Sequence, residues 1–197
     1  YDELTRLKVE SASQPDNIEI INLDKECSAD FISEINKKIE SLSREYILFV
    51  PNGTVLDQFM LWALKKKIDD NPEADVIYAD EKIGNMYCFK PIFSPDTFCT
   101  GNYIGNTICM KTKTIKDIGC FDESAQNGFL YDSLFKISEA QSKLKIEDRI
   151  VNISKILSWR KEWYDTSYDE SVIKRHLDRI DAKYSRIDNL GNGVFNI

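Results

Sequence analysis

The chain of 197 residues carries 33 Asp and Glu against 26 Lys and Arg, which gives a formal net charge of −7. This acidic balance argues against nucleic acid as a partner, because phosphate backbones require clustered basic side chains. No stretch approaches the roughly 20 apolar residues of a membrane span. A composition of 42% hydrophobic and 30% charged residues is that of a globular domain.

Strand and helix signals alternate through the first 80 residues. Short β-branched runs predict strands, and apolar residues at helical spacing predict helices with Ser28 and Thr54 as their N-caps. The predicted strands are 18–22, 46–50 and 76–80, and the predicted helices are 28–42 and 55–69. This order predicts an α/β fold, a mainly parallel central sheet with flanking helices.

The second half of the chain has a less regular pattern. Residues 85–90 and 106–110 read as strands on either side of a proline-rich loop at 90–98. A short helix at 113–121 is stopped by Gly119, a natural left-handed C-cap. Leu130, Leu134 and Ile137 mark a further helix, residues 149–153 a last strand, and residues 165–184 a charged amphipathic helix.

The cysteines and the single histidine give no metal-binding pattern. An odd number of cysteines without a C-x-x-C pair predicts reduced thiols in a cytoplasmic protein, and a zinc site is the alternative. His176 is distant in sequence from every cysteine, and we interpret it as a flank residue of the C-terminal helix. The five cysteines are Cys27, Cys88, Cys99, Cys109 and Cys120.

Two segments fall where an open α/β sheet binds its ligands, beyond the carboxyl ends of the strands. The first is the turn at 51–54, which follows the buried run "YILFV", and the second is the pair Asp80 and Glu81. Both carboxylates can contact sugar hydroxyls, and the alternative is a solvated turn that caps a helix or hairpin.

A series of motifs resembles the family-two nucleotide-sugar glycosyltransferases of GT-A fold, especially those that build bacterial surface polysaccharides. "NPEADVIYADE" matches the family pattern N-P-x-A-D-x-I-Y-S-D-E, and "FKPIFSPD" matches F-K-P-x-x-S-P-D. "NYIG", "GCF" and "ISKILSWR" follow in the family order. The resemblance implies sugar transfer from a nucleotide sugar to a glycan acceptor, with either ligand as a partner.

The chain departs from this family at the positions that carry its chemistry. Family aspartates that hold Mn²⁺ or Mg²⁺ are replaced by Pro51 and Gly53, so we expect no metal cofactor, because such cations need anionic oxygen ligands. The general base is replaced by Leu130, which leaves Asp132 as a weak candidate for a catalytic role. The late family histidine is replaced by Ser158.

The same comparison predicts how the chain is organised. No residues in 1–17 resemble the family's first nucleotide-binding strand, so we expect a GT-A-like domain over 1–164 that lacks this strand, followed by a C-terminal helix and tail over 165–197. A catalytically degenerate binding module is the main functional prediction. The alternatives are an active metal-independent transferase that uses Lys90, Arg160 and Lys161, and one part of a larger multidomain glycosyltransferase with a partner domain.

Six residues are predicted to contact substrate, each with a structural alternative. Trp159 can stack on a sugar and Arg160 can pair with a phosphate, or both can simply pack on the sheet. Asn102 and Tyr103 can touch an acceptor or stabilise their own loop. The full predicted set is Asp80, Glu81, Asn102, Tyr103, Trp159 and Arg160.

Overall fold

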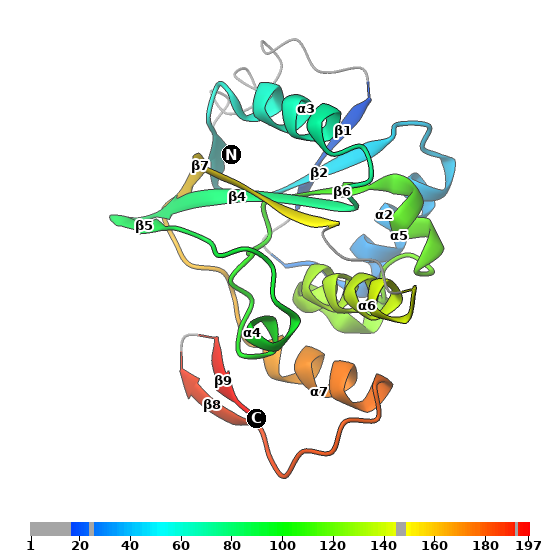
Figure 1. Cartoon of the computed structure of the whole chain (residues 1–197), viewed down its shortest axis with the longest axis vertical. Helices are drawn as coiled ribbons and strands as arrows, with labels where there is room; N and C mark the ends of the chain where they lie inside the picture. Colours follow the sequence, from blue (N-terminus) through cyan, green and yellow to red (C-terminus); the bar gives the residue numbers. More distant parts are fainter. Residues whose placement is uncertain (1–16, 24–25, 145–148, 192) are drawn as a thin grey trace.

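The computed structural model describes residues 17–23, 26–144, 149–191 and 193–197. These residues form a seven-stranded sheet with helices on both faces and a separate pair of strands near the C-terminus (Figure 1). The sheet order is β1–β2–β6–β4–β7–β3, and β5 pairs with β4. The strands are β1 Ile18–Leu23, β2 Tyr46–Pro51, β3 Thr54–Leu56, β4 Val76–Ile83, β5 Met86–Cys88, β6 Ile108–Lys111, β7 Ile150–Arg160, β8 Asp188–Gly191 and β9 Val194–Asn196.

The four longest strands of the sheet share one direction. β1 pairs with β2 in parallel and β4 pairs with β7 in parallel, while β6 lies antiparallel to both β2 and β4. The short strands β3 and β5 are antiparallel additions to β7 and β4. The predicted α/β class with a mainly parallel central sheet is therefore confirmed, with β6 inserted between its two parallel pairs.

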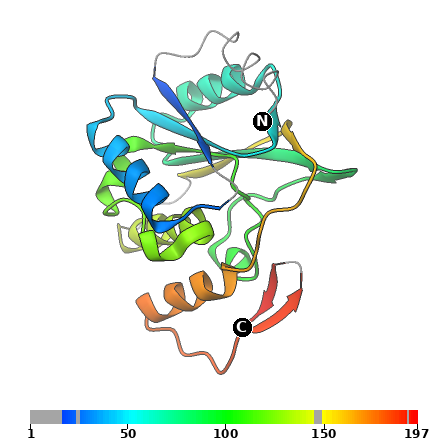
Figure 2. The same ribbon diagram turned by 180° about the vertical axis from the view of Figure 1, so that it is seen from behind.

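The helices divide the core into two layers. α3 covers one face of the sheet, and α2, α5 and α6 cover the other, with α7 packed beyond α6 (Figure 1; Figure 2 from behind). Buried side chains of α7 and Phe195 of β9 belong to the same core cluster as α2 and α6. The helices are α2 Ala29–Ser41, α3 Met60–Asp70, α4 Pro95–Cys99, α5 Thr112–Asp117, the 3₁₀ helix η1 Glu123–Gly128, α6 Phe129–Leu144 and α7 Asp169–Arg179.

Two predicted helix ends are confirmed by their capping contacts. The Ser28 hydroxyl accepts a hydrogen bond from the Phe31 amide at the start of α2. Gly119 adopts a φ of 83° after α5, and the amide of Cys120 donates to the carbonyl of Ile115. Both contacts satisfy backbone groups that a helix end otherwise leaves without partners.

The predicted helix over 55–69 begins later than its capping pattern indicated. Thr54–Leu56 is strand β3, which pairs with Ser158–Arg160 of β7, so Thr54 is not an N-cap. The Asp57 carboxylate accepts a hydrogen bond from the Phe59 amide, and α3 starts at Met60. Pairing with a distant strand has overridden the local cap signal, because cross-strand hydrogen bonds satisfy the same backbone groups.

Other predicted boundaries need correction. The segment 90–98 is not a loop throughout, because Ser94 caps the short helix α4 with Pro95 in its first turn. The strand at 149–153 runs on to Arg160 and is followed by β8 and β9, so it is not the last. The amphipathic helix at 165–184 is limited to Asp169–Arg179.

His176 is buried in the interface between α6 and α7, and is not a flank residue. Its ring stacks on Phe135 with centroids 4.1 Å apart, and Nδ1 lies 2.7 Å from the Glu139 carboxylate. No disulfide joins the five cysteines, all of which lie in the described residues. Among the helices of the described segments, none has the length and apolar character needed to cross a membrane.

Candidate functional site

A cleft of about 520 Å³ opens at the carboxyl ends of β1 and β2. Parallel strands end at one edge of a sheet, so the turn after β2 and the end of β1 lie together there. The segment that follows β7 forms the opposite wall, and the start of α6 closes one side. The lining residues are Leu23, Glu26, Cys27, Pro51, Asn52, Gly53, Asn106, Asn127, Phe129, Arg160, Lys161, Glu162, Trp163, Tyr164 and Asp165.

The turn after β2 is shaped by backbone constraints and carries no acidic side chain. Pro51 ends β2 beside Leu23, and the Asn52 amide donates to the Leu23 carbonyl at 2.9 Å. Gly53 has a φ of 77°, the left-handed conformation that glycine adopts without strain. In the part of the chain that the structure describes, no three His, Cys, Asp or Glu side chains gather closely enough to hold a metal ion. This donor set does not fit a hard cation.

Arg160 supplies a cationic group that is not neutralised within the described residues. Its guanidinium lies 4.0 Å from the centroid of the Tyr164 ring, and Nε donates to the backbone carbonyl of Glu162. The buried Nη1 atom makes no hydrogen bond to any described residue. Because Arg160 lines the cleft, its positive charge attracts an anionic ligand there.

Behind the cleft, Glu81 and Lys90 form a buried ion pair. Lys90 Nζ lies 2.8 Å from Glu81 Oε1, and both side chains are 3% exposed. The Tyr164 hydroxyl donates to Glu81 Oε2 at 2.6 Å. Burial, followed by the charge of Glu81, raises the pKa of Tyr164, which keeps its hydroxyl protonated as a donor. The carboxylate of Glu81 is thereby fully engaged inside the protein and fixes Tyr164 under Arg160.

Gly105 permits this close packing. It has a φ of 74°, and a Cβ added there would lie 2.9 Å from both Glu81 Oε1 and a ring carbon of Tyr164. The amide of Gly105 donates to the Asn102 side chain at 3.0 Å. A glycine at this point of the "NYIG" motif therefore lets the wall of the cleft approach the sheet.

The predicted site residues separate into those near the cleft and those remote from it. Arg160 lines the cleft, and Glu81 lies behind Tyr164. Asn102 Nδ2 lies 3.4 Å from Oδ1 of Asn106, a residue that lines the cleft. Asp80 accepts a hydrogen bond from the Lys90 amide and is 4% exposed. Its oxygens therefore serve the loop and are shielded from solvent.

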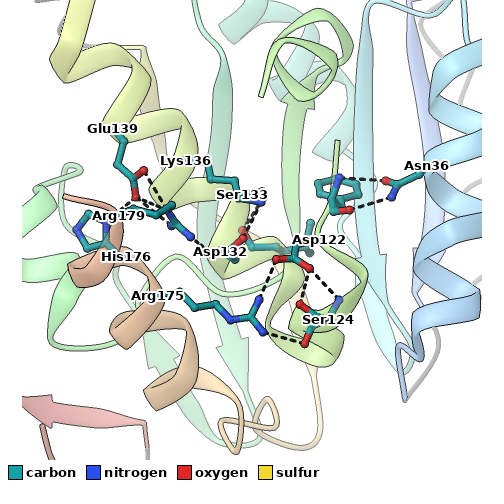
Figure 3. A network of polar contacts seen from close by, with 12 residues as sticks. Asn36, Asp122, Ser124, Asp132, Ser133, Lys136, Glu139, Arg175, His176 and Arg179 are labelled. Atoms are coloured by element: carbon teal, nitrogen blue, oxygen red, sulfur yellow. Dashed lines mark hydrogen bonds and ion pairs between the residues drawn. The ribbon is translucent and has the colours of Figure 1, made fainter. Parts of the chain in front are cut away.

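Tyr103, Trp159 and Asp132 do not line the cleft. Tyr103 packs edge-on against Phe98 and its hydroxyl accepts from the Ser94 amide. Trp159 alternates with Arg160 along β7, so its exposed ring lies on the opposite face of the strand. Asp132 is completely buried in α6, where it pairs with Arg179 of α7 at 2.7 Å and with Lys136 of its own helix at 3.0 Å (Figure 3).

Sequence reasoning missed several residues of the cleft. Asn106, Asn127 and Asp165 lie in loops or at helix ends whose position depends on tertiary packing. Tyr164, which supports Arg160 from one side, is not among the predicted site residues. The one local signal was the cluster of aromatic and charged residues directly after the "SWR" motif.

Comparison with known proteins identifies the fold. No family model matches the chain. A curated relative, uncharacterized protein y4gI of Sinorhizobium fredii (strain NBRC 101917 / NGR234), is 29% identical over 166 residues. The match covers 80% of this chain and 18% of that protein, so the chain spans less than a fifth of the relative's length.

Similar solved structures are those of S. aureus TarS, a glycosyltransferase. The structure of TarS residues 1–349 gives a TM-score of 0.54 at 18% identity, with 78% of this chain and 46% of that chain covered. The complex of the same TarS segment with UDP gives a TM-score of 0.58 at 15% identity, with 94% of this chain and 63% of that chain covered. Its complex with UDP-GlcNAc gives a TM-score of 0.54 at 17% identity, with 76% of this chain and 47% of that chain covered. The chain therefore has a glycosyltransferase-like fold.

Proposed function

We propose that this chain is a glycosyltransferase-like domain that binds a nucleoside diphosphate sugar without a metal ion. The supporting observation is Arg160, which lines the cleft and whose neighbours among the described residues are the Tyr164 ring and the Glu162 carbonyl, so no described carboxylate neutralises it. The cleft lies at the strand ends where this fold class binds ligands. TarS, which shares the fold, has been crystallised with UDP and UDP-GlcNAc.

Arg160 takes the role of charge neutralisation that the turn after β2 does not provide. A planar guanidinium binds two oxygens of a diphosphate at once and stays charged at every physiological pH. Tyr164 holds it in place from one face, since the ring contact limits the orientations of the side chain. Lys161 adds a second positive charge at the same wall.

We further propose that the bound sugar is not transferred. Leu130, at the position that matches the family's base, is 1% exposed, does not line the cleft and has no atom that accepts a proton. A positioned base contributes about 10²–10⁴-fold in rate. The chain thus acts as a binding module, and its five thiols suit the cytoplasmic location expected from the sequence.

An active metal-independent transferase is the second candidate, favoured by the carboxylate of Asp165 in the cleft. The match covers 18% of the curated relative, so that protein has further segments beside the matched one, and a partner domain stays a prediction from the sequence. Release of UDP from UDP-GlcNAc, measured with and without glycan acceptors, separates the candidates. We expect no release above background, and turnover that Asp165→Asn abolishes would instead establish the transferase.

Metal-independent binding is the first test of the proposal. Isothermal titration with UDP and UDP-GlcNAc is expected to give the same affinity in EDTA and in Mn²⁺, because the cleft offers no cluster of carboxylates. Arg160→Gln should weaken binding of both ligands at least tenfold, since charge-assisted hydrogen bonds contribute about 1.5–3 kcal/mol.

The matched control is Arg186→Gln, which removes an exposed arginine paired with Asp188 outside the cleft. It should leave both affinities unchanged. A strong dependence on Mn²⁺, or equal binding by the Arg160→Gln variant and the unaltered chain, would contradict the proposal.

A further inference from the structure

Asp165 and Asn127 form a preorganised pair at the rim of the cleft. Asn127 Nδ2 donates to Asp165 Oδ2 at 3.1 Å, and the Ser167 amide donates to Asp165 Oδ1 at 3.0 Å. The Asn127 carbonyl oxygen accepts from the Cys27 amide at 2.6 Å. The Ser167 amide, more than any other neighbour, lowers the pKa of Asp165, so the carboxylate is ionised at neutral pH.

The backbone that carries Asn127 is strained. Gln126, within η1, has a φ of 45° and a ψ of −130°, a conformation that residues other than glycine rarely adopt. The Tyr168 hydroxyl donates to the Gln126 side chain at 2.6 Å, and a Cβ at Gly128 would lie 2.7 Å from Val172. Contacts from the start of α7 therefore maintain this conformation. Such strain, of order 1–3 kcal/mol, persists only where the surrounding structure imposes it, and it is frequent at ligand-binding sites.

Arg160 and Asp165 have different neighbours. Within the described residues they form no ion pair with each other, although both line the cleft. Asp165 is held by neutral donors, and Arg160 by a ring and a backbone carbonyl. A ligand that suits this arrangement carries an anionic group at one end and hydroxyl groups at the other.

We propose that Asp165 and Asn127 form a diol-recognition subsite, which accepts the vicinal hydroxyls of a ribose or hexose ring while Arg160 holds the phosphates. This inference rests on the proposed function and specifies how the ligand lies in the cleft. The Asp165 carboxylate accepts hydrogen bonds from the hydroxyls. The second N–H of the Asn127 amide donates to a hydroxyl oxygen, because Asp165 engages only the first.

Asp165→Asn tests the subsite without changing the size of the side chain. Four probes are titrated into the full chain by calorimetry: inorganic pyrophosphate, UDP, 2′,3′-dideoxy-UDP and UDP-GlcNAc. We expect the variant to bind its diol-bearing ligand about three- to tenfold more weakly, which is the range of one exposed hydrogen bond. Pyrophosphate affinity should not fall, because pyrophosphate has no hydroxyl groups.

The probes also identify the sugar ring that the subsite binds. If the subsite binds the ribose, the substitution lowers the affinities for UDP and UDP-GlcNAc equally and leaves the affinity for dideoxy-UDP unchanged. If the subsite binds the hexose, the substitution lowers only the affinity for UDP-GlcNAc. Glu170→Gln, an exposed carboxylate on α7 outside the cleft, is the matched control for loss of charge and should change none of the affinities.

Each contrary result has a distinct meaning. Nucleotide binding by the unaltered chain that Asp165→Asn leaves unchanged overturns the subsite and retains the proposed function. A loss of pyrophosphate affinity equal to the loss for nucleotides overturns it as well, because that pattern reports a general disturbance of the cleft. If the unaltered chain binds none of the four probes, the proposed function and the subsite fail together.

Discussion

Replacing Arg179 with methionine is expected to lower the free energy of unfolding by about 3 kcal/mol. Arg179 Nη1 lies 2.7 Å from Asp132, a completely buried carboxylate, and Nε lies 3.0 Å from each oxygen of Glu139 (Figure 3). Removal of one partner from a buried ion pair costs about 3–5 kcal/mol where the charge left behind is uncompensated, and Lys136, 3.0 Å from Asp132, compensates part of it here. The Arg179 side chain is 28% exposed, so we expect the lower end of that range.

Arg175→Met is the matched control, because it lies on the same helix and also pairs with an acidic residue across the interface. Its 3.0 Å contact with Asp122 joins side chains that are 31% and 37% exposed, so the loss should stay within about 1 kcal/mol. Urea unfolding followed by circular dichroism gives both values, provided that the m-value is unchanged. Equal effects of the two substitutions would show that Asp132 does not depend on Arg179.

Asp169 is expected to make the stability of the fold fall between about pH 4 and pH 7. It is 5% exposed at the start of α7, and its burial, followed by the charge of Asp165, raises its pKa from 3.8 to about 7. A helix N-terminus ordinarily favours an ionised carboxylate by about 0.3–1 kcal/mol. Here the desolvation of the buried carboxylate outweighs that attraction.

Proton linkage gives the direction in which the free energy of unfolding changes with pH. Because the folded state binds the proton of Asp169 more tightly than the unfolded state, its contribution is complete below about pH 4 and is lost as the pH rises through about 7. A shift of about three pKa units corresponds to about 4 kcal/mol. Asp169→Asn does not titrate, so its stability relative to the unaltered chain should increase by several kcal/mol from pH 4 to pH 8.

Thermal melts of both proteins across that range measure the difference, with Asp178→Asn, an exposed carboxylate on the same helix, as the control. The difference in midpoint between Asp169→Asn and the unaltered chain should widen as the pH rises, whereas the Asp178→Asn curve should run parallel to the reference. Parallel curves for Asp169→Asn would mean that its carboxyl titrates normally in the fold.

The central strands and helices were predictable because their signals are local. The run Tyr46–Val50 is buried at every position, and Ser28 caps α2 as its side chain indicated. β3 was not predictable, since Thr54 resembles an N-cap until β7 is placed beside it. The burial of His176 likewise depends on α6 and α7 meeting, which no local pattern records.

The candidate site was predicted in part for the same reason. The turn at Pro51–Gly53 and the position of Arg160 followed from strand ends and from a motif, and both line the cleft. Asp165 and Asn127 did not follow, because they meet only through the strained backbone at Gln126 and the packing of α7. Sequence patterns indicate which residues end a strand, whereas tertiary packing decides which loop lies opposite them.

The position of β4 has a consequence for synthesis on the ribosome. β4 lies between β6 and β7 and is buried from Val76 to Glu81, yet its parallel partner β7 consists of residues 150–160. A nascent chain that has not reached β7 therefore displays an apolar strand with one edge lacking its partner. Such edges pair readily with the same strand of a neighbouring chain. Slower initiation, which spaces nascent chains apart, should for this reason raise the yield of folded protein more than faster elongation does.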